Sequence, residues 1–141
     1  MSMTLEEKQQ EIVEEFAVFD DWMEKYEYII DLGKDLPKID ESLKTEDRLI
    51  EGCQSRVWVA SSIENEKMRF TADSDAIITK GIIGLLIRVL DGENPETIVK
   101  ADLHFIGDIG LQEHLSPTRA NGLLGMVKRL KTEALKHIQN N

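Results

Sequence analysis

The chain contains one cysteine, Cys53, in the segment EGCQSRVWVA. Gly52 before it allows the backbone a tight turn, and the residues after it, Gln54, Ser55 and Arg56, are polar. A cysteine thiolate is a nucleophile, and a nearby cation such as Arg56 can lower the pKa of the thiol. The alternative is a small, inert residue of the hydrophobic core, since cysteine is among the most buried residue types. The polar neighbours indicate a loop, and chemistry alone leaves both interpretations open.

Two other functions of a cysteine, as the nucleophile of a hydrolase and as a zinc ligand, are not supported by a sequence motif. A cysteine–histidine hydrolase needs a base beside the thiol, whereas His104, His114 and His137 all lie far along the chain. A zinc site usually carries paired ligands, and the sequence has no CxxC, no HExxH and no second cysteine. We therefore predict no metal, although a site that joins Cys53 to distant His or Asp ligands stays open.

Two further segments carry charged residues that suggest chemistry. DSDAIITKG contains Asp73 and Asp75, which are either a catalytic or metal-binding carboxylate pair, or a strand end and a helix N-cap. LSPTRANGL contains Arg119, which either faces a partner or anion, or is an exposed side chain at an ordinary helix start. The structural interpretation is the simpler one for both segments. The glycines of GDIG are not followed by Lys-Ser or Lys-Thr, so no phosphate loop is predicted.

The composition limits the classes of partner. Lys and Arg number 17 against 27 Asp and Glu, so the net charge is 17 − 27 = −10. Such a surface repels the phosphates of nucleic acids and of anionic membranes, and we expect neither as a partner. It suits a protein partner that presents a basic patch. A length of 141 residues is typical of one domain.

The cysteine count and the N-terminal sequence predict a cytoplasmic protein. A single cysteine forms no internal disulfide, which fits a reducing compartment. The first residues, MSMTLEEKQQ, have neither a basic nor an apolar region of the kind that signal peptides carry. The longest apolar stretch, AIITKGIIGLLIRVL, is interrupted by Lys80 and Arg88 and is too short to span a bilayer.

The elements that would position these residues begin with two helices. Thr4 and Glu7 match a capping box ahead of an apolar stripe, and a second helix is predicted from Asp21 to near Gly33. Residues 34–50 are predicted to form a surface loop with a short strand near Leu49. Residues 56–63 are rich in β-branched and aromatic residues, and apolar and polar residues alternate over 67–72, which predicts an antiparallel hairpin with Val57, Val59 and Ile63 on one face.

A helix predicted over 76–90 is apolar on nearly all sides, so we expect it to be buried, with Asp75 as its N-cap. Gly81 and Gly84 within it indicate a close approach of another backbone. Pro95 is predicted to open a short helix, residues 102–111 are predicted to be helical, and a last helix is predicted from Ser116-Pro117. The predicted fold class is α+β, a small antiparallel sheet packed by helices.

Four blocks of the sequence resemble the SufE family of sulfur acceptor proteins, in the family's order and spacing. The resemblance covers nearly the whole chain and implies a single SufE-like domain over 1–141, with an α+β fold similar to that of IscU-type scaffolds. The segment 93–110 and the tail after residue 136 match least. The four blocks are YIIDLGKDLP (28–37), GCQSRVW (52–58), DSDAIITKG (73–81) and LSPTRANGL (115–123).

The resemblance implies that Cys53 takes persulfide sulfur from a cysteine desulfurase of the SufS type and that the chain stimulates this desulfurase. The sulfur would pass to a scaffold complex of the SufBCD type for iron–sulfur cluster assembly. The chain would then be an accessory protein rather than an enzyme, with no cofactor of its own, because the PLP belongs to the desulfurase.

The resemblance also suggests roles for residues around the cysteine. Asp75, Lys80 and Arg119 fall on the recurring blocks and are interpreted as loop-supporting or partner-facing residues, and Gln54, Ser55 and Arg56 flank the thiol. Thr118 stands where the family commonly has Ser. An alternative hypothesis is a non-covalent protein-interaction module of the same fold, in which Cys53 is only a packing residue.

Overall fold

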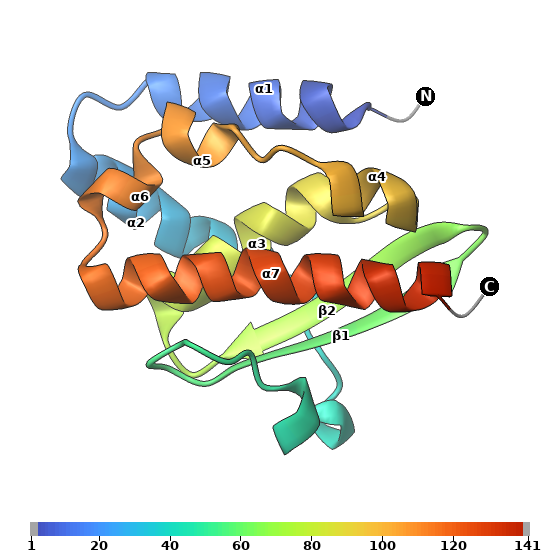
Figure 1. Cartoon of the computed structure of the whole chain (residues 1–141). Coiled ribbons are helices and arrows are strands. Elements are labelled where there is room, and N and C mark those ends of the chain that lie inside the picture. Colours follow the sequence, from blue (N-terminus) through green and yellow to red (C-terminus); the bar gives the residue numbers. More distant parts are fainter. Residues whose placement is uncertain (1–2, 140–141) are drawn as a thin grey trace.

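The computed structural model describes residues 3–139, so the predicted domain 1–141 reaches past the described part at both ends. Its most apolar helix, α3 (Ile77–Leu90), lies at the centre (Figure 1). It packs against α1 (Leu5–Ala17), α2 (Trp22–Leu32), α7 (Pro117–Gln139) and the second strand of the hairpin. Ten of its residues are buried, which confirms the prediction of a buried helix.

The two glycines of α3 have different surroundings. A Cβ atom added at Gly81 would lie 2.1 Å from the main-chain oxygen of Ile29, so α2 and α3 touch backbone to backbone there, as predicted. At Gly84 the nearest atom to such a Cβ belongs to the side chain of Leu36, at 3.8 Å. The close approach predicted at Gly84 is therefore wrong, because a wider gap separates α3 from its neighbours at that turn.

The predicted N-cap of α3 is also wrong. The cap position is Ala76, and no side chain accepts a hydrogen bond from the first turn of the helix. The carboxylate of Asp75 instead accepts the main-chain N–H of Arg56 at 3.0 Å. The Asp75 carboxylate faces Arg56, the residue before the hairpin, and so it does not face the start of the helix.

The two N-terminal helices begin where predicted. Thr4 and Glu7 form both hydrogen bonds of the capping box at the start of α1. Asp21 caps α2 by accepting the N–H of Glu24 at 2.9 Å. The helix ends at Leu32, and Gly33 opens a short 3₁₀ turn, η1 (Gly33–Asp35).

The antiparallel hairpin consists of β1 (Val57–Glu64) and β2 (Lys67–Ser74), paired from Val57↔Ser74 to Glu64↔Lys67. Val57 and Val59 are buried in the core, but Ile63 is 42% exposed because the hairpin extends beyond the core at its turn. The predicted inner face is therefore correct at its first two positions only.

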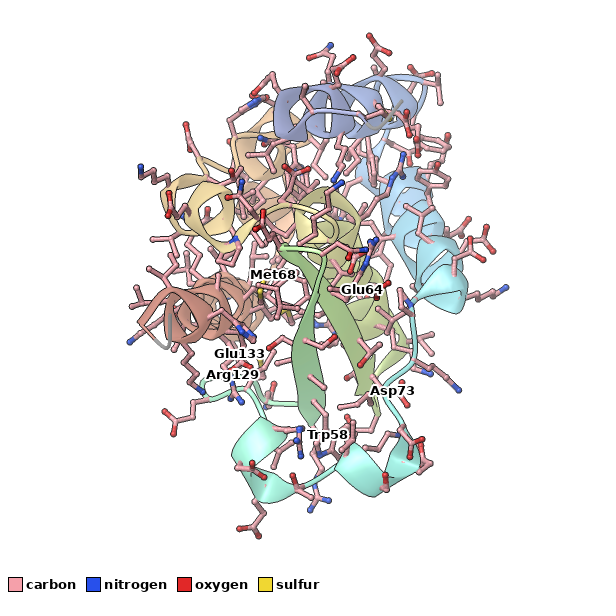
Figure 2. The ribbon with its side chains drawn as sticks, turned by 90° about the vertical axis from the view of Figure 1, so that its right-hand side faces the viewer. Trp58, Glu64, Met68, Asp73, Arg129 and Glu133 are labelled. Atoms are coloured by element: carbon pink, nitrogen blue, oxygen red, sulfur yellow. The ribbon has the colours of Figure 1, made fainter. Side chains whose placement is uncertain are left out.

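Residues 36–50 connect α2 to the hairpin and touch both of its edges. Two short turns, η2 (Glu41–Leu43) and η3 (Glu46–Arg48), lie beside the hairpin end that carries Trp58 and Asp73 (Figure 2). Leu49 forms a single antiparallel bridge to Trp58, and Lys38 forms a parallel bridge to Ala72. The strand predicted near Leu49 is thus reduced to one bridge.

The chain after α3 is helical in short pieces and then in one long one. Pro95 opens α4 (Pro95–Lys100), as predicted. Residues 102–111 are helical only in part, in α5 (Phe105–Asp108) and at the start of α6 (Leu111–His114). The predicted α+β class is confirmed. Among residues 3–139, no helix is both long and apolar enough to cross a membrane.

Candidate functional site around Cys53

Cys53 lies in the short loop between Ile50 and the start of β1. Gly52 before it has φ +89°, a conformation that side chains disfavour, so glycine is needed for the turn that delivers the cysteine. The thiol points to α7, where its sulfur lies 3.6 Å from the main-chain oxygen of Gly122. The side chain is half-buried, which places it between a core residue and a free surface thiol.

The thiol borders a small pocket of about 230 Å³ between the loop, α3 and α7. Ile82 and Met126 give it an apolar floor, since both are buried. The remainder is lined by the thiol, the Gln54 amide, three hydroxyl groups, one guanidinium and Gly122. The full lining comprises Cys53, Gln54, Ser55, Thr79, Ile82, Thr118, Arg119, Gly122 and Met126.

The pocket does not activate the thiol at rest. Burial raises the pKa of Cys53 above its ordinary value, so the thiol is neutral at pH 7. Arg56, considered from the sequence as an activating cation, does not line the pocket. Arg119 does line it, and its guanidinium donates to the hydroxyl of Tyr26 at 3.0 Å.

The end of the loop is tethered to the turn that precedes α3. Asp75 accepts the N–H of Arg56 at 3.0 Å, and the hydroxyl of Ser74 donates to the carbonyl of Arg56 at 2.8 Å. Ser55 and Thr79 place their hydroxyl oxygens 3.3 Å apart across the pocket. Asp75 and Ser55 therefore support the loop, and Gln54 is exposed at the pocket.

Lys80 and Asp73 belong to a separate ion-pair cluster. The buried Asp73 carboxylate binds Lys44 at 2.7 Å and Lys80 at 3.3 Å. Burial works to raise the pKa of Asp73, but hydrogen bonds from Lys44, from the Ser74 N–H and from Lys80 outweigh it and lower that pKa. Asp73 and Asp75 have different partners, so they do not form a catalytic carboxylate pair.

The histidines are not bases for Cys53. His104 lies between Glu6 and Asp108, and His114 bonds the carbonyl of Gly110. Neither lines the thiol pocket, and nor does His137. Within the described residues, no group of three His, Cys, Asp or Glu side chains is arranged to hold a metal ion.

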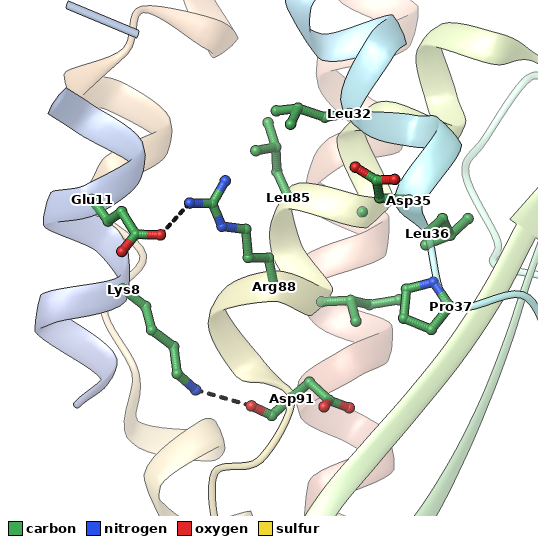
Figure 3. Close-up of a pocket in the computed structure, with 11 residues that line it drawn as sticks. Lys8, Glu11, Leu32, Asp35, Leu36, Pro37, Leu85, Arg88 and Asp91 are labelled. Atoms are coloured by element: carbon green, nitrogen blue, oxygen red, sulfur yellow. Dashed lines mark hydrogen bonds and ion pairs between the residues drawn. The ribbon is translucent and has the colours of Figure 1, made fainter. Parts of the chain in front are cut away.

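A second hollow, of about 520 Å³, lies between α1, α3 and the segment after α2 (Figure 3). Four of its charged residues, Lys8, Glu11, Arg88 and Asp91, have hydrogen-bond or ion-pair partners. Arg88 pairs with Glu11 at 2.6 Å, and Lys8 donates to the carbonyl of Asp91 at 2.9 Å. Cys53 is not among its lining residues, so the thiol pocket is the better candidate site.

Sequence reasoning named Thr118 and Arg119 but missed the other residues of α3 and α7 that line the pocket. Thr79 and Gly122 both lie inside the blocks that resemble SufE proteins, but nothing in their spacing relates them to Cys53. Ile82 and Met126 carry only the signal of core residues. Their role emerges because the loop folds back onto two helices that lie far away in the sequence.

Comparison with known proteins agrees with this description. The family model SufE, described as an Fe-S metabolism associated domain, matches residues 10–134. An uncharacterised SufE-like protein of Rhizobium meliloti is 38% identical over 129 residues, which span 88% of this chain and 92% of that protein. The chloroplastic/mitochondrial SufE-like protein 1 of Arabidopsis thaliana is 40% identical over 91% of this chain but only 35% of its own length.

The fold also occurs among solved structures. A hypothetical protein from Thermus thermophilus, whose structure was determined in solution, superposes with a TM-score of 0.77 over 94% of this chain and 96% of that one. Its sequence is 24% identical, so this similarity supports the fold alone.

Proposed function

The chain belongs to the SufE family of Fe-S metabolism, and we propose that it accepts persulfide sulfur from a cysteine desulfurase on Cys53. It passes this sulfur on for iron–sulfur cluster assembly, and it stimulates the desulfurase by removing the persulfide. One observation carries the proposal. The thiol lies on a loop at the edge of a pocket of about 230 Å³, which has room for an additional sulfur atom.

The transfer is an exchange at sulfur. The Cys53 thiolate attacks the terminal sulfur of the desulfurase persulfide, so that a sulfur–sulfur bond forms on Cys53 as the one in the desulfurase breaks. The desulfurase cysteine leaves as a thiolate, and Cys53 carries the persulfide. No net oxidation or reduction occurs, because one sulfur–sulfur bond replaces another. A single cysteine suits a carrier, since no second thiol can discharge the persulfide as a disulfide.

The resting thiol needs activation before it can attack. Burial raises the pKa of Cys53, so the reactive thiolate is scarce while the loop lies on α7. Movement of the loop into the desulfurase site would remove this penalty, and the thiol proton would then pass to solvent or to a base of the desulfurase. Arg119, which lines the pocket, supplies a positive charge for the anionic sulfur when the loop returns.

The proposed partners supply the chemistry that this chain lacks. A PLP-dependent desulfurase of the SufS type would cleave cysteine, and a SufBCD-type scaffold would receive the sulfur. The chain itself would be a carrier and activator without a cofactor. A reducing compartment such as the cytoplasm keeps Cys53 reduced between turnovers. The Arabidopsis relative is named as a chloroplastic/mitochondrial protein.

One observation favours a second candidate, a non-covalent interaction module. Burial raises the pKa of Cys53, as expected for a packing cysteine. In that case Cys53 would matter for the shape of the loop and not for its chemistry.

The rate of alanine release by a cysteine desulfurase distinguishes the two. The wild-type chain is expected to raise this rate, and Cys53→Ala is expected to bind the desulfurase without raising it. Equal stimulation by wild type and Cys53→Ala would establish the interaction module and exclude the carrier.

A further inference from the structure

The segment that leads into Cys53 is fastened to α7 by one arginine. The guanidinium of Arg129 donates to the carbonyl of Leu49 at 2.9 Å and to the carbonyl of Asp47 at 2.7 Å. One planar group thus binds two main-chain oxygens from the same short segment. A lysine cannot reproduce this arrangement, because its ammonium is a compact point charge without a fixed fork.

Arg129 is itself held from the opposite side. Its Nε donates to Glu133 at 3.1 Å, and Glu133 also accepts from the hydroxyl of Ser61 on β1 at 2.8 Å and from Lys136 at 3.1 Å. Figure 2 shows Arg129 and Glu133 together beside the hairpin. Glu133 on α7, which Ser61 of β1 holds in place, therefore fixes the orientation of the guanidinium that binds the segment before the loop.

One helical turn closer to the thiol, the loop lies against bare helix backbone. A Cβ atom added at Gly125 would stand 2.6 Å from the main-chain oxygen of Glu51, a distance that backbone cannot tolerate without moving. Gly122, Gly125 and Arg129 lie three and four residues apart, so they share one face of α7. Along that face they meet Cys53, Glu51 and then Leu49.

The remaining contact between the segment and α7 is open. A hollow of about 800 Å³ separates them, and most of its lining residues are polar or charged. Ile50 is buried in the core and its N–H donates to the carbonyl of Val57 at 2.8 Å, so the segment is anchored to the hairpin at that residue. On the side that faces α7, the segment is held by the two hydrogen bonds of Arg129 and by the close approach at Gly125.

We infer that Arg129 and Gly125 are positioning residues for the Cys53 loop. Arg129 binds the carbonyls of Asp47 and Leu49, which precede the loop. Gly125, which has no side chain, allows the backbone of Glu51 to pack directly on α7. Together they set how often the thiol leaves its pocket. The consequence for sulfur transfer rests on the function proposed above, whereas the consequence for the accessibility of Cys53 does not.

Alkylation of the one cysteine by iodoacetamide under native conditions tests this inference. Arg129→Gln and Gly125→Ala are each expected to raise the alkylation rate of Cys53 about tenfold, because the loop opens more often. Arg129→Lys should be as fast as Arg129→Gln, since the charge is kept but the fork is lost. Wild-type rates for both Arg129→Gln and Gly125→Ala would overturn the inference.

Two matched controls accompany these variants. Lys136→Gln removes another cation that binds Glu133 but makes no contact with the loop, and Gly107→Ala adds a methyl group to a helical glycine with no atom within 4 Å. Both should alkylate at the wild-type rate. A rate increase in the controls equal to that in the variants would contradict a specific role for Arg129 and Gly125.

A dependence on denaturant separates positioning from mere loss of stability. If the loop opens locally, the alkylation rate of the variants changes little with added urea well below the unfolding transition. If the rate instead rises steeply, in step with global unfolding, Arg129 and Gly125 are only structural and the inference fails. Gly125→Ala keeps this test valid even if Arg129→Gln does not fold, because alanine favours a helix.

The desulfurase assay connects the inference to transfer. In this assay the concentration of the chain is varied, and the Arg129 and Gly125 variants are expected to change kcat and KM by different factors. A loop that is already open docks on the desulfurase more readily, but it protects the bound sulfur less well. If Cys53 takes up no persulfide at all, the proposed function fails while the alkylation result still decides the role of Arg129 and Gly125.

Discussion

The sulfur of Cys53 lies 3.6 Å from the main-chain oxygen of Gly122, although 69 positions separate the two residues in the sequence. A Cβ atom at position 122 would stand 3.5 Å from that sulfur. The absence of a side chain there leaves the pocket open beside the thiol. If Cys53 carries a persulfide, as proposed above, the additional sulfur would occupy this space beside Gly122.

Replacement of Gly122 by valine should therefore expose a bound persulfide. The valine side chain fills the pocket, so the terminal sulfur is left in solvent, where a thiol reductant reaches it more easily. We expect persulfide on Gly122→Val to be lost to dithiothreitol about tenfold faster than on wild type. Leu124→Val is the control, since Leu124 is 54% exposed on the same helix. Equal rates for the two variants and wild type would show that the pocket gives no shelter.

Asp75→Ala should loosen the loop at its other end. The substitution removes the acceptor for the N–H of Arg56, a hydrogen bond of a kind that contributes about 1 kcal/mol. Alkylation of Cys53 is then expected to be about fivefold faster. Asp75→Asn keeps an acceptor oxygen and should stay near the wild-type rate. If Asn and Ala behave alike, the hydrogen bond is not what restrains the loop.

The two glycines of α3 should respond oppositely to alanine. Gly81→Ala forces a methyl group against the carbonyl of Ile29, and we expect it to lower the free energy of unfolding by about 3 kcal/mol. Gly84→Ala meets no close atom and gains helix propensity, so it should raise that free energy by up to about 1 kcal/mol. Urea denaturation of both variants measures the difference. Similar losses in both would contradict the packing described for α2 and α3.

His104 should make stability depend on pH. Its hydrogen bond to Asp108 raises its pKa, burial opposes this, and the bond to Glu6 adds to the rise. The folded pKa therefore lies above the unfolded value, so the stabilisation is complete below that unfolded value and is lost as the pH rises through the folded pKa. The free energy of unfolding of wild type minus that of His104→Gln should fall as the pH rises from below the ordinary histidine pKa of about 6.5 through the raised folded pKa. A difference that stays constant, or grows with pH, would refute the charged contact.

Much of the fold could be predicted from the sequence because its signals are local. The capping box of Thr4 and Glu7 and the apolar surface of α3 follow from residue types and spacing. Residue spacing alone favoured a helix cap at Asp75, and only the resemblance suggested a loop-supporting residue, because a carboxylate before a helix can form either contact. Only the tertiary position of Arg56 decides between the two.

The sequence pointed to the centre of the site and to part of its surroundings, since Gln54, Ser55 and Arg119 also line the thiol pocket. Cys53 is singled out by being the one thiol, and its neighbours in the sequence indicate a loop. Gly122 and Thr79 reach it only because α7 and α3 pack against that loop, and a contact of this kind leaves no trace in residue spacing. For the same reason the sequence did not reveal that burial would raise the pKa of the thiol.

Mass spectrometry of the intact chain tests the central proposal most directly. Wild type and Cys53→Ser would be incubated side by side with a cysteine desulfurase and L-cysteine, without reductant. The proposal predicts a gain of about 32 Da, one sulfur atom, on wild type alone. No gain on wild type, with a desulfurase that turns over and binds the chain, would contradict it, and so would an equal gain on Cys53→Ser.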